Sequence, residues 1–248
     1  MSERPYVTLS CAMSIDGHLD STAPRRLAMS NEADLDRVDQ VRSENDAIMV
    51  GASTLRRDNP RLMVKSQSRR TRRAAAGLPG SPTKVTVTGT GDLPVDSAFF
   101  TAGDAGKIVY CPTGSARGLT SQLGESATVV GLGENVTMAA VLDDLAGRGT
   151  KRLMVEGGGK LLTQFLAADL VDELHLVIAP FFVGEERAPR IVGPATFPWT
   201  ASRRAMLADT RQIGDVVLLR YALSDRVGLV AGEPVVRTSQ EALSMGAR

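Results

Sequence analysis

The order of apolar and polar residues predicts strands that alternate with helices. Short apolar runs, each long enough for one buried strand, occur at 6–13, 47–50, 84–88, 107–111, 128–130 and 152–155. Leu35, Val38 and Val41 recur at a spacing of three and predict one face of a helix, and 136–145 shows a similar apolar stripe. Two further strands, at 170–180 and 216–223, follow with no helix between them. This order predicts an α/β fold with a mostly parallel central sheet, helices on both faces and antiparallel C-terminal strands.

Other stretches break this alternation. Residues 65–82 are rich in Ser, Arg, Gly and Pro, and we expect an exposed loop there whose arginines are solvated rather than bound to an anion. Residues 180–199 look irregular. The last stretch, 224–248, is polar and weakly patterned, so we expect one domain over 1–223 followed by a C-terminal extension.

Composition excludes several classes of function. The apolar fraction of 43% suffices for a substantial core, and 29 Lys and Arg against 28 Asp and Glu favour neither a nucleic-acid partner nor a membrane surface. Cys11 and Cys111 form neither a metal motif nor a disulfide framework, which predicts no metal site and a reducing cytoplasm. We see no signal peptide and no apolar run of the ~20 residues that a membrane span needs.

A glycine-rich turn joins the strand at 152–155 to an apolar helix. Glu156 ends the strand, Gly157, Gly158 and Gly159 form the turn, and Lys160 begins the helix. Glycines let a backbone approach a ligand closely, and a helix N-terminus attracts phosphate, so this turn predicts a phosphate or dinucleotide cradle. The turn matches neither a P-loop nor a Gly-x-Gly-x-x-Gly fingerprint, and a tight strand-to-helix turn is the alternative.

Three polar segments follow predicted strands, at 14–17, 51–58 and 156–158. The carboxyl ends of parallel strands meet at one edge of a sheet, where ligands bind in open α/β folds. We therefore expect a site that combines residues of these three segments.

Four segments in a fixed order carry a family resemblance. They are Ala12–Gly17, Val50–Leu62 with its Asp58-Asn59-Pro60, Glu156–Gly159, and Leu170–Leu174. Each is weak alone, but the ordered set resembles the reductase domain of riboflavin biosynthesis, the RibD C-terminal domain family, which has a dihydrofolate-reductase-like fold. The zinc pattern of the deaminase domain that often accompanies this reductase is missing, so the resemblance implies a stand-alone reductase.

The resemblance implies NADPH as hydride donor and, as substrate, a pyrimidine with a ribosylamino group and a 5′-phosphate. It implies Asp58 and Glu156 as catalytic residues, and the sequence does not decide which handles the proton. The implied substrate-binding residues are Arg42, Arg61, Leu62 and Lys65, with Arg42 and Lys65 on the phosphate. The implied cofactor contacts are Ser14, Ala28, Thr54, Gly157, Gly158, Gly159, Lys160, Leu161 and Leu162.

Some of these residues have a simpler interpretation, which the ordered motifs disfavour for Asp58 and which stays open for Arg42 and Lys65. Asp58 can cap a turn, Arg42 can be a solvated charge on a helix, and Lys65 can be a loop charge. For the 2′-phosphate of the cofactor, residues 88–90 are favoured over Arg117. The resemblance also implies a homodimer, with Leu174–Ile178 as the candidate interface.

Two positions depart from the bacterial members. Ser10 stands where those members carry Lys, and Ala28 stands where they often carry Trp. The first segment is closer to archaeal and fungal members, which reduce the pyrimidinone before its deamination, so the identity of the pyrimidine stays open. The alternatives are a same-fold reductase of a pterin, dihydrofolate or specialised pyrimidine, and a non-catalytic nucleotide-binding protein.

Overall fold

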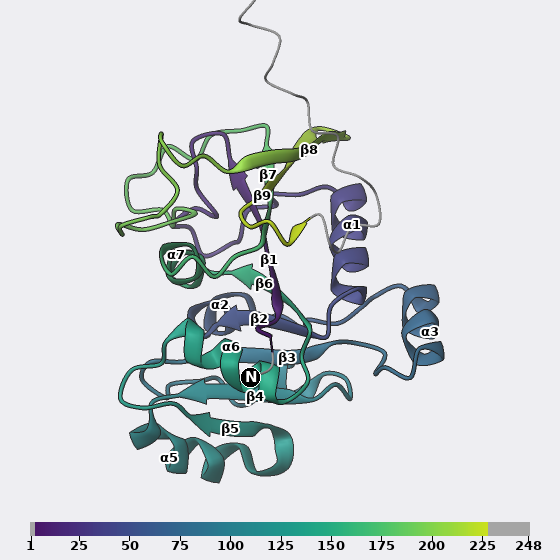
Figure 1. Cartoon of the computed structure of the whole chain (residues 1–248), viewed down its shortest axis with the longest axis vertical. Coiled ribbons are helices and arrows are strands. Elements are labelled where there is room, and N and C mark those ends of the chain that lie inside the picture. Colours follow the sequence, from purple (N-terminus) through teal and green to yellow (C-terminus); the bar gives the residue numbers. More distant parts are fainter. Residues whose placement is uncertain (1–2, 228–248) are drawn as a thin grey trace, which may run out of the picture.

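The computed structural model describes residues 3–227, which build one nine-stranded sheet (Figure 1). The strands are β1 (Tyr6–Ser14), β2 (Ala47–Gly51), β3 (Thr83–Val87), β4 (Lys107–Cys111), β5 (Thr128–Gly131), β6 (Arg152–Gly157), β7 (Glu173–Ala179), β8 (Met206–Ile213) and β9 (Val216–Ala222). Their order in the sheet is β5-β4-β3-β2-β6-β1-β7-β9-β8. All neighbouring strands from β5 to β7 run parallel to one another. The last two pairs, β7 with β9 and β9 with β8, are antiparallel. The predicted fold class is confirmed.

Helices connect the parallel strands. They are α1 (Glu32–Ser43), α2 (Ala52–Asp58), α3 (Gln67–Ala75), α4 (Ala98–Thr101), α5 (Thr113–Leu123) with a 3₁₀ turn at Gly124–Ser126, α6 (Met138–Gly147) and α7 (Gly159–Ala167). Asn31 begins α1 by accepting a hydrogen bond from the backbone N–H of Asp34. The α5 helix was not expected from the sequence, because its small and polar residues lack a wide apolar stripe.

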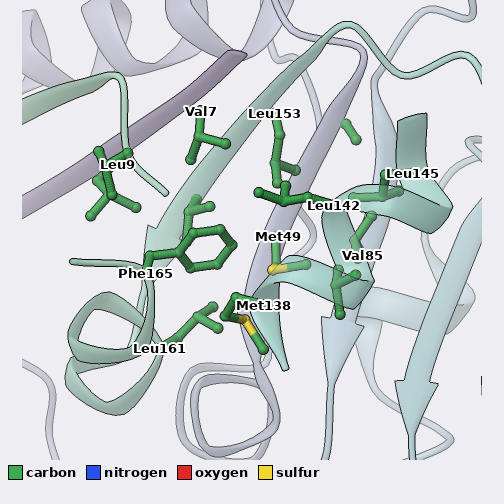
Figure 2. Close-up of a cluster of buried hydrophobic side chains, with 14 of the residues drawn as sticks. Val7, Leu9, Met49, Val85, Met138, Leu142, Leu145, Leu153, Leu161 and Phe165 are labelled. Carbon is green, nitrogen blue, oxygen red and sulfur yellow. The ribbon is translucent and has the colours of Figure 1, made fainter. Parts of the chain in front are cut away.

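The sheet separates two apolar layers, because successive residues of a strand point to opposite faces. In β2, Met49 packs on the face covered by α6 and α7, while Ile48 and Val50 pack on the other face with α2, α4 and α5. Figure 2 shows the first layer, in which Phe165 of α7 and Leu142 of α6 lie against strand residues. Helices therefore cover both faces, and the carboxyl ends of the parallel strands stay open for a site.

The expectation of a loop over 65–82 was wrong, since this stretch contains α3. Ser66 accepts the backbone N–H of Arg69 and begins the helix. Arg69 binds Asp36 and Asp39 of α1 at 2.6 and 3.0 Å, and Arg73 is buried, where it donates to the carbonyls of 43, 45 and 79. The helix packs through charged groups rather than an apolar face, so hydrophobic periodicity gave no signal for it.

Strand β8 also lies in a stretch that the sequence left unassigned. Its residues are mostly exposed, and Met206 and Leu207 rank among the exposed apolar side chains. Its register with β9 shifts between Leu207 and Asp209. An edge strand with one neighbour needs no buried apolar alternation, so the sequence pattern did not predict it.

Most of the predicted extension at 224–248 lies outside the described residues. Its first residues pack on the domain, where Ser224 donates to Asp172 and Val227 is buried.

Among residues 3–227, no helix has the length and apolar character of a membrane span. Over the same range, His, Cys, Asp and Glu side chains form no cluster suited to a metal ion.

Candidate active site

A cavity of about 320 Å³ opens at the carboxyl edge of the sheet, beside α1 and α2. The Arg, Asp and Glu residues of its lining are Arg26, Arg37, Arg42, Asp34, Asp58 and Glu156. Its other lining residues include Ser10, Cys11, Ala12, Leu27, Ala28, Met29, Ser30, Val50, Thr54, Pro60, Leu62 and Val177. The wall is therefore apolar with a few charged groups that face inward, as is common in sites for small molecules.

Glu156 reaches this cavity through an irregularity in the sheet. Met49 of β2 pairs with Val155 of β6, but the next residue, Val50, pairs with Gly157. Glu156 is therefore the extra residue of a β-bulge, a feature that often re-aims a side chain beside a site. The bulge places the carboxylate toward α1.

Arg42 of α1 holds Glu156 in a two-pronged ion pair. Its Nε and Nη2 donate to the two carboxylate oxygens at 2.5 and 2.6 Å. Both side chains are largely buried, with exposed fractions of 17% and 14%. Burial disfavours the charged guanidinium, but Glu156 outweighs it, so the pKa of Arg42 lies above its usual value. This pairing occupies the fork that the sequence analysis assigned to the substrate phosphate.

Asp58, the last residue of α2, faces Arg26 of the loop that follows β1. Arg26 Nη1 donates to Asp58 Oδ2 at 2.6 Å. Burial raises the pKa of Asp58; Arg26 and Arg57 oppose this rise, and Asp20 adds to it. Asp58 is thus a largely buried carboxylate, 10% exposed on its side chain, whose pKa responds to the charges beside it.

A third pair lies deeper under α1. Arg37 Nε donates to Asp34 Oδ1 at 2.7 Å, and the Asp34 side chain is only 1% exposed. Arg37 also lies 3.4 Å from Nδ1 of His175, whose pKa is lowered by burial against the opposing effect of Glu173. The charged wall of the cavity therefore continues into a buried polar network between β7 and α1.

The glycine turn has its own packing requirements. Gly157 and Gly158 have φ values of +103° and +92°, which L side chains rarely adopt. A Cβ on Gly158 would lie 2.9 Å from Thr54 Oγ1, and a Cβ on Gly159 would collide with the carbonyl oxygen of Arg190. Part of this glycine requirement thus comes from the loop around Arg190, rather than from a ligand.

The structure brings together six of the residues predicted for the site. Ala28, Arg42, Thr54, Asp58, Leu62 and Glu156 all line the cavity. Thr54 also donates to the carbonyl of Gly157 at 3.2 Å, which links the cavity to the glycine turn. Leu62 is held at a positive φ of 46° and is buried.

Other predicted residues do not line the cavity. Ser14 is fully buried and donates to Asp16 at 2.5 Å, so its hydroxyl holds a turn. Arg61 and Lys65 are exposed and lie outside the lining, as does the turn from Gly157 to Leu162. Thr88 is buried and accepts the N–H groups of Thr90 and Gly91. The assigned roles of these residues remain predictions.

Sequence reasoning missed Arg26, Asp34 and Arg37. Asp34, Arg37 and the recognised Arg42 lie on α1 at spacings that share a face with Val38 and Val41. Charged residues that interrupt the apolar face of a helix were a usable signal for Asp34 and Arg37. Arg26 lies in an irregular loop, where no periodicity exists to single it out.

Comparisons with known proteins agree with this architecture. Residues 5–219 match the RibD C-terminal domain. The chain is 34% identical over 195 residues to the 2,5-diamino-6-ribosylamino-4(3H)-pyrimidinone 5′-phosphate reductase of Archaeoglobus fulgidus, covering 78% of this chain and 89% of that protein. The enzyme of the same name from Methanothermobacter thermautotrophicus is 32% identical over 222 residues, covering 89% of this chain and 99% of that one.

Solved structures share the fold at lower identity. A pyrimidine reductase-like protein from Corynebacterium diphtheriae superposes with a TM-score of 0.72 at 23% identity, covering 88% of this chain and 91% of that one. The yeast riboflavin biosynthesis reductase Rib7 gives a TM-score of 0.62 at 20% identity, covering 89% and 90%. At these identities the likeness supports the fold.

Proposed function

The chain belongs to the RibD C-terminal domain family, and on that premise we propose that it is an NADPH-dependent reductase of riboflavin biosynthesis in the cytoplasm. Its substrate is a pyrimidine 5′-phosphate whose ribosylamino group becomes a ribitylamino group. The observation that carries the proposal is the single cavity that Asp58 and Glu156, taken from two separate family segments, both line, each with an arginine partner. Relatives above 30% identity bear the name of such a reductase.

The residues around the glycine turn fit a nicotinamide dinucleotide. The first turn of α7 contains no acidic residue and includes the exposed Lys160, so the helix N-terminus favours a pyrophosphate. Thr54 joins this turn to the cavity wall. When bound, NADPH supplies the hydride that reduces C1′ of the sugar. A preference for NADPH over NADH is part of the proposal.

The protein's own groups have to hold and move protons. Opening the ribose ring breaks the C1′–O4′ bond, transfers a proton to O4′ and leaves a C=N bond at C1′. Asp58 is suited to donating that proton, because burial raises its pKa and it lies at the cavity wall. Glu156 is held in position by two hydrogen bonds from Arg42, which suits it to orient the substrate and to stabilise positive charge at the nitrogen.

The pyrimidine itself is proposed from the relatives. Those above 30% identity are named for the 2,5-diamino-pyrimidinone, the ring before deamination. Ser10, which lines the cavity where bacterial bifunctional members carry Lys, agrees with that choice. We therefore expect the diamino ring to be preferred over the deaminated one.

The test follows NADPH absorbance with purified protein. The diamino and deaminated ribosylaminopyrimidine phosphates are offered in parallel, with dihydrofolate and NADH in separate arms. We expect oxidation with the diamino compound and a loss of about 10²–10⁴-fold in Asp58→Asn, the range of one general acid. Asp92→Asn removes an exposed carboxylate outside the cavity lining and serves as the matched control.

The possible outcomes separate the proposal from its rivals. Oxidation with dihydrofolate alone would identify a same-fold reductase of another substrate. NADPH binding without turnover of any compound would contradict the proposed substrate class. Absence of NADPH binding would overturn the proposal as a whole.

The proposed assembly is a homodimer formed through the face of β7 and β9. Leu174, Leu176 and Ile178 of β7 pair with Tyr221, Leu219 and Val217 of β9, and all six are only partly buried or exposed. Such an apolar sheet face is suited to a second copy of the chain.

If the protein is this homodimer, light scattering should give twice the chain mass. Leu219→Asp should yield monomers, whereas Leu78→Asp, at an exposed site on the loop after α3, should not. A wild-type monomer would refute this assembly.

A further inference from the structure

A second, smaller cavity lies between the C-terminal end of α1 and the sheet, at the edge away from the candidate active site. Its volume is about 150 Å³. Tyr6, Arg152 and Glu173, the first residues of β1, β6 and β7, line it, so it lies at the amino edge of the parallel strands. Its other polar lining residues are Thr8, Glu44, His175 and Arg220. Pockets for drug-sized ligands have about 300–1,000 Å³, so this cavity admits only a small group.

His175 lies between this cavity and the active-site cavity. It pairs in register with Ser10, which lines the active-site cavity, and its Nδ1 lies 3.4 Å from Nη1 of Arg37. An arginine only donates, so Nδ1 accepts and the neutral ring carries its proton on Nε2. This Nε2–H is buried and has no aligned acceptor within residues 3–227, although Glu173 Oε1 lies 3.1 Å away. His175 therefore offers a free donor to the second cavity.

Arg152 offers a further free donor together with a charge. Its Nε is buried without a hydrogen-bond partner, and its Cζ lies 5.1 Å from the centre of the Tyr6 ring. Within the described part of the chain, its guanidinium makes no ion pair. A partly buried cation without a counter-ion is unfavourable, because burial removes part of its hydration. Water in the cavity can satisfy the hydrogen bonds, but water does not balance the charge.

The two carboxylates of the lining do not neutralise Arg152. Glu173 already accepts two hydrogen bonds from Arg220, at 2.8 and 2.5 Å. Glu44 is exposed to solvent, which screens its charge. The last carbonyls of α1 would repel an anion, but the N–H groups of Glu44 and Asn45 already bind those of residues 41 and 42. The cavity therefore has unpaired donors and a positive charge in excess.

We propose that this second cavity is a binding site for a small oxyanion, either inorganic phosphate or the phosphoryl group of a metabolite. Arg152 supplies the charge and its buried Nε–H, and His175 supplies its Nε2–H. Thr8, the register partner of Glu173, adds a hydroxyl to the same cavity. The site is separate from the active-site cavity, and it requires no assumption about the reaction. An anion bound there connects β6 with β7 and stabilises the folded state.

NMR of the imidazole rings tests the site without substrate or cofactor. The sequence contains two histidines, so His18 is an internal reference and His175→Gln assigns the signals. Inorganic phosphate is titrated at constant pH and ionic strength, with NaCl and adenosine 5′-monophosphate in separate arms. We expect a saturable change at His175 with phosphate and none with NaCl. A response to phosphate alone identifies the free ion as ligand, and a response to both phosphates identifies a phosphoryl group.

Variants locate the binding. Arg152→Gln should weaken phosphate binding at least about tenfold, the value of one charge-assisted hydrogen bond, and Arg152→Lys, which keeps the charge, should fall between. The Arg152 side chain makes no hydrogen bond within residues 3–227, so the fold loses none, and an unchanged His18 signal verifies this. Arg187→Gln removes an exposed arginine that lines neither cavity and should bind as the wild type does.

Three results would overturn the proposal. The first is the absence of a saturable response at His175. The second is an equal response to NaCl, which would reflect ionic strength alone. The third is phosphate binding that is unchanged in Arg152→Gln, or equally weakened in Arg187→Gln, which would place the bound phosphate elsewhere on the protein.

Discussion

Arg42 and Glu156 are joined across 114 positions of sequence by two hydrogen bonds of 2.5 and 2.6 Å at the wall of the cavity. The sequence alone suggested one of them for the phosphate and the other for chemistry. Their pairing makes them one unit, in which the arginine sets the position of the acid.

Removal of either partner should therefore impair the same step. We expect Arg42→Gln and Glu156→Gln to lower kcat more than they raise KM. The double variant should be little worse than either single one, with a coupling free energy of about 1–3 kcal/mol. Steady-state kinetics of the four proteins measure this cycle. Additive losses, or a change in KM alone for Arg42→Gln, would show that Arg42 acts on the substrate independently.

The Arg190 carbonyl oxygen lies so close to Gly159 that we expect even one added methyl group to be too large there. Gly159→Ala should destabilise the protein by about 1–3 kcal/mol, because the loop must move to admit the Cβ. Gly118→Ala in α5 meets no neighbouring atom and should stabilise by about 0.5–1 kcal/mol. Urea unfolding of both variants checks the contrast. Equal stability of the two would mean that the loop at 190 adapts freely.

The buried ion pairs of Glu173 predict that the folded protein loses stability in acid. It is 7% exposed on its side chain, accepts from Arg220 and lies 3.1 Å from His175 Nε2. Burial alone would raise its pKa, but His175 and Arg220 outweigh burial and lower it from 4.5 to about 2. A lowered acid pKa stabilises the fold above the unfolded value, and this contribution disappears as pH falls from 4.5 towards 2.

Glu173→Gln should accordingly cost about 3 kcal/mol near neutral pH, the scale for an unpaired buried partner. The difference from wild type should shrink as pH falls below 4.5. Unfolding curves at several pH values measure both effects. Glu134→Gln, at an exposed position, is the control and should match the wild type throughout. A difference that stays constant with pH would contradict the assignment.

The contacts of Asp39 predict that this residue anchors α3 to α1. This buried carboxylate accepts the backbone N–H groups of Lys65 and Ser66 and binds Arg69. Asp39→Ala should lower stability by about 2–3 kcal/mol and speed amide exchange in α3, since a buried cation and two donors lose their partner. Asp36→Ala removes an acid that is 67% exposed from the same arginine and should cost under about 1 kcal/mol. Similar losses in both variants would contradict this view.

The sequence predicted the elements whose information is local and apolar. The run at 47–50 and the stripe of Leu142 and Leu145 appear as β2 and α6 within a residue or two. The helix α3 was missed because Arg69 and Arg73 pack through ion pairs and backbone carbonyls, which no hydrophobic period reveals. Strand β8 was missed because an exposed edge does not need alternation.

The candidate site also contains features that the sequence predicted and features that it did not. Asp58 and Glu156 were recognisable from short motifs in the proper order, and the structure places both at one cavity. The pairing of Arg42 with Glu156 was not predictable, because it depends on the register of β6 against β2 and on the position of α1. Lys65, predicted from the same resemblance, is exposed and outside the lining, since its backbone is tied to Asp39.

Strand β6 presents Glu156 by containing one residue more than the matching stretch of β2. The position of this acid is thus encoded by a residue count as well as by a residue identity. Deleting one residue between Val155 and Gly157 would restore a regular ladder and would close the sheet without the acid. Grafting this site onto a related sheet therefore requires transplanting the length mismatch between the two strands, because a point substitution to Glu in a regular strand would leave the carboxylate misdirected.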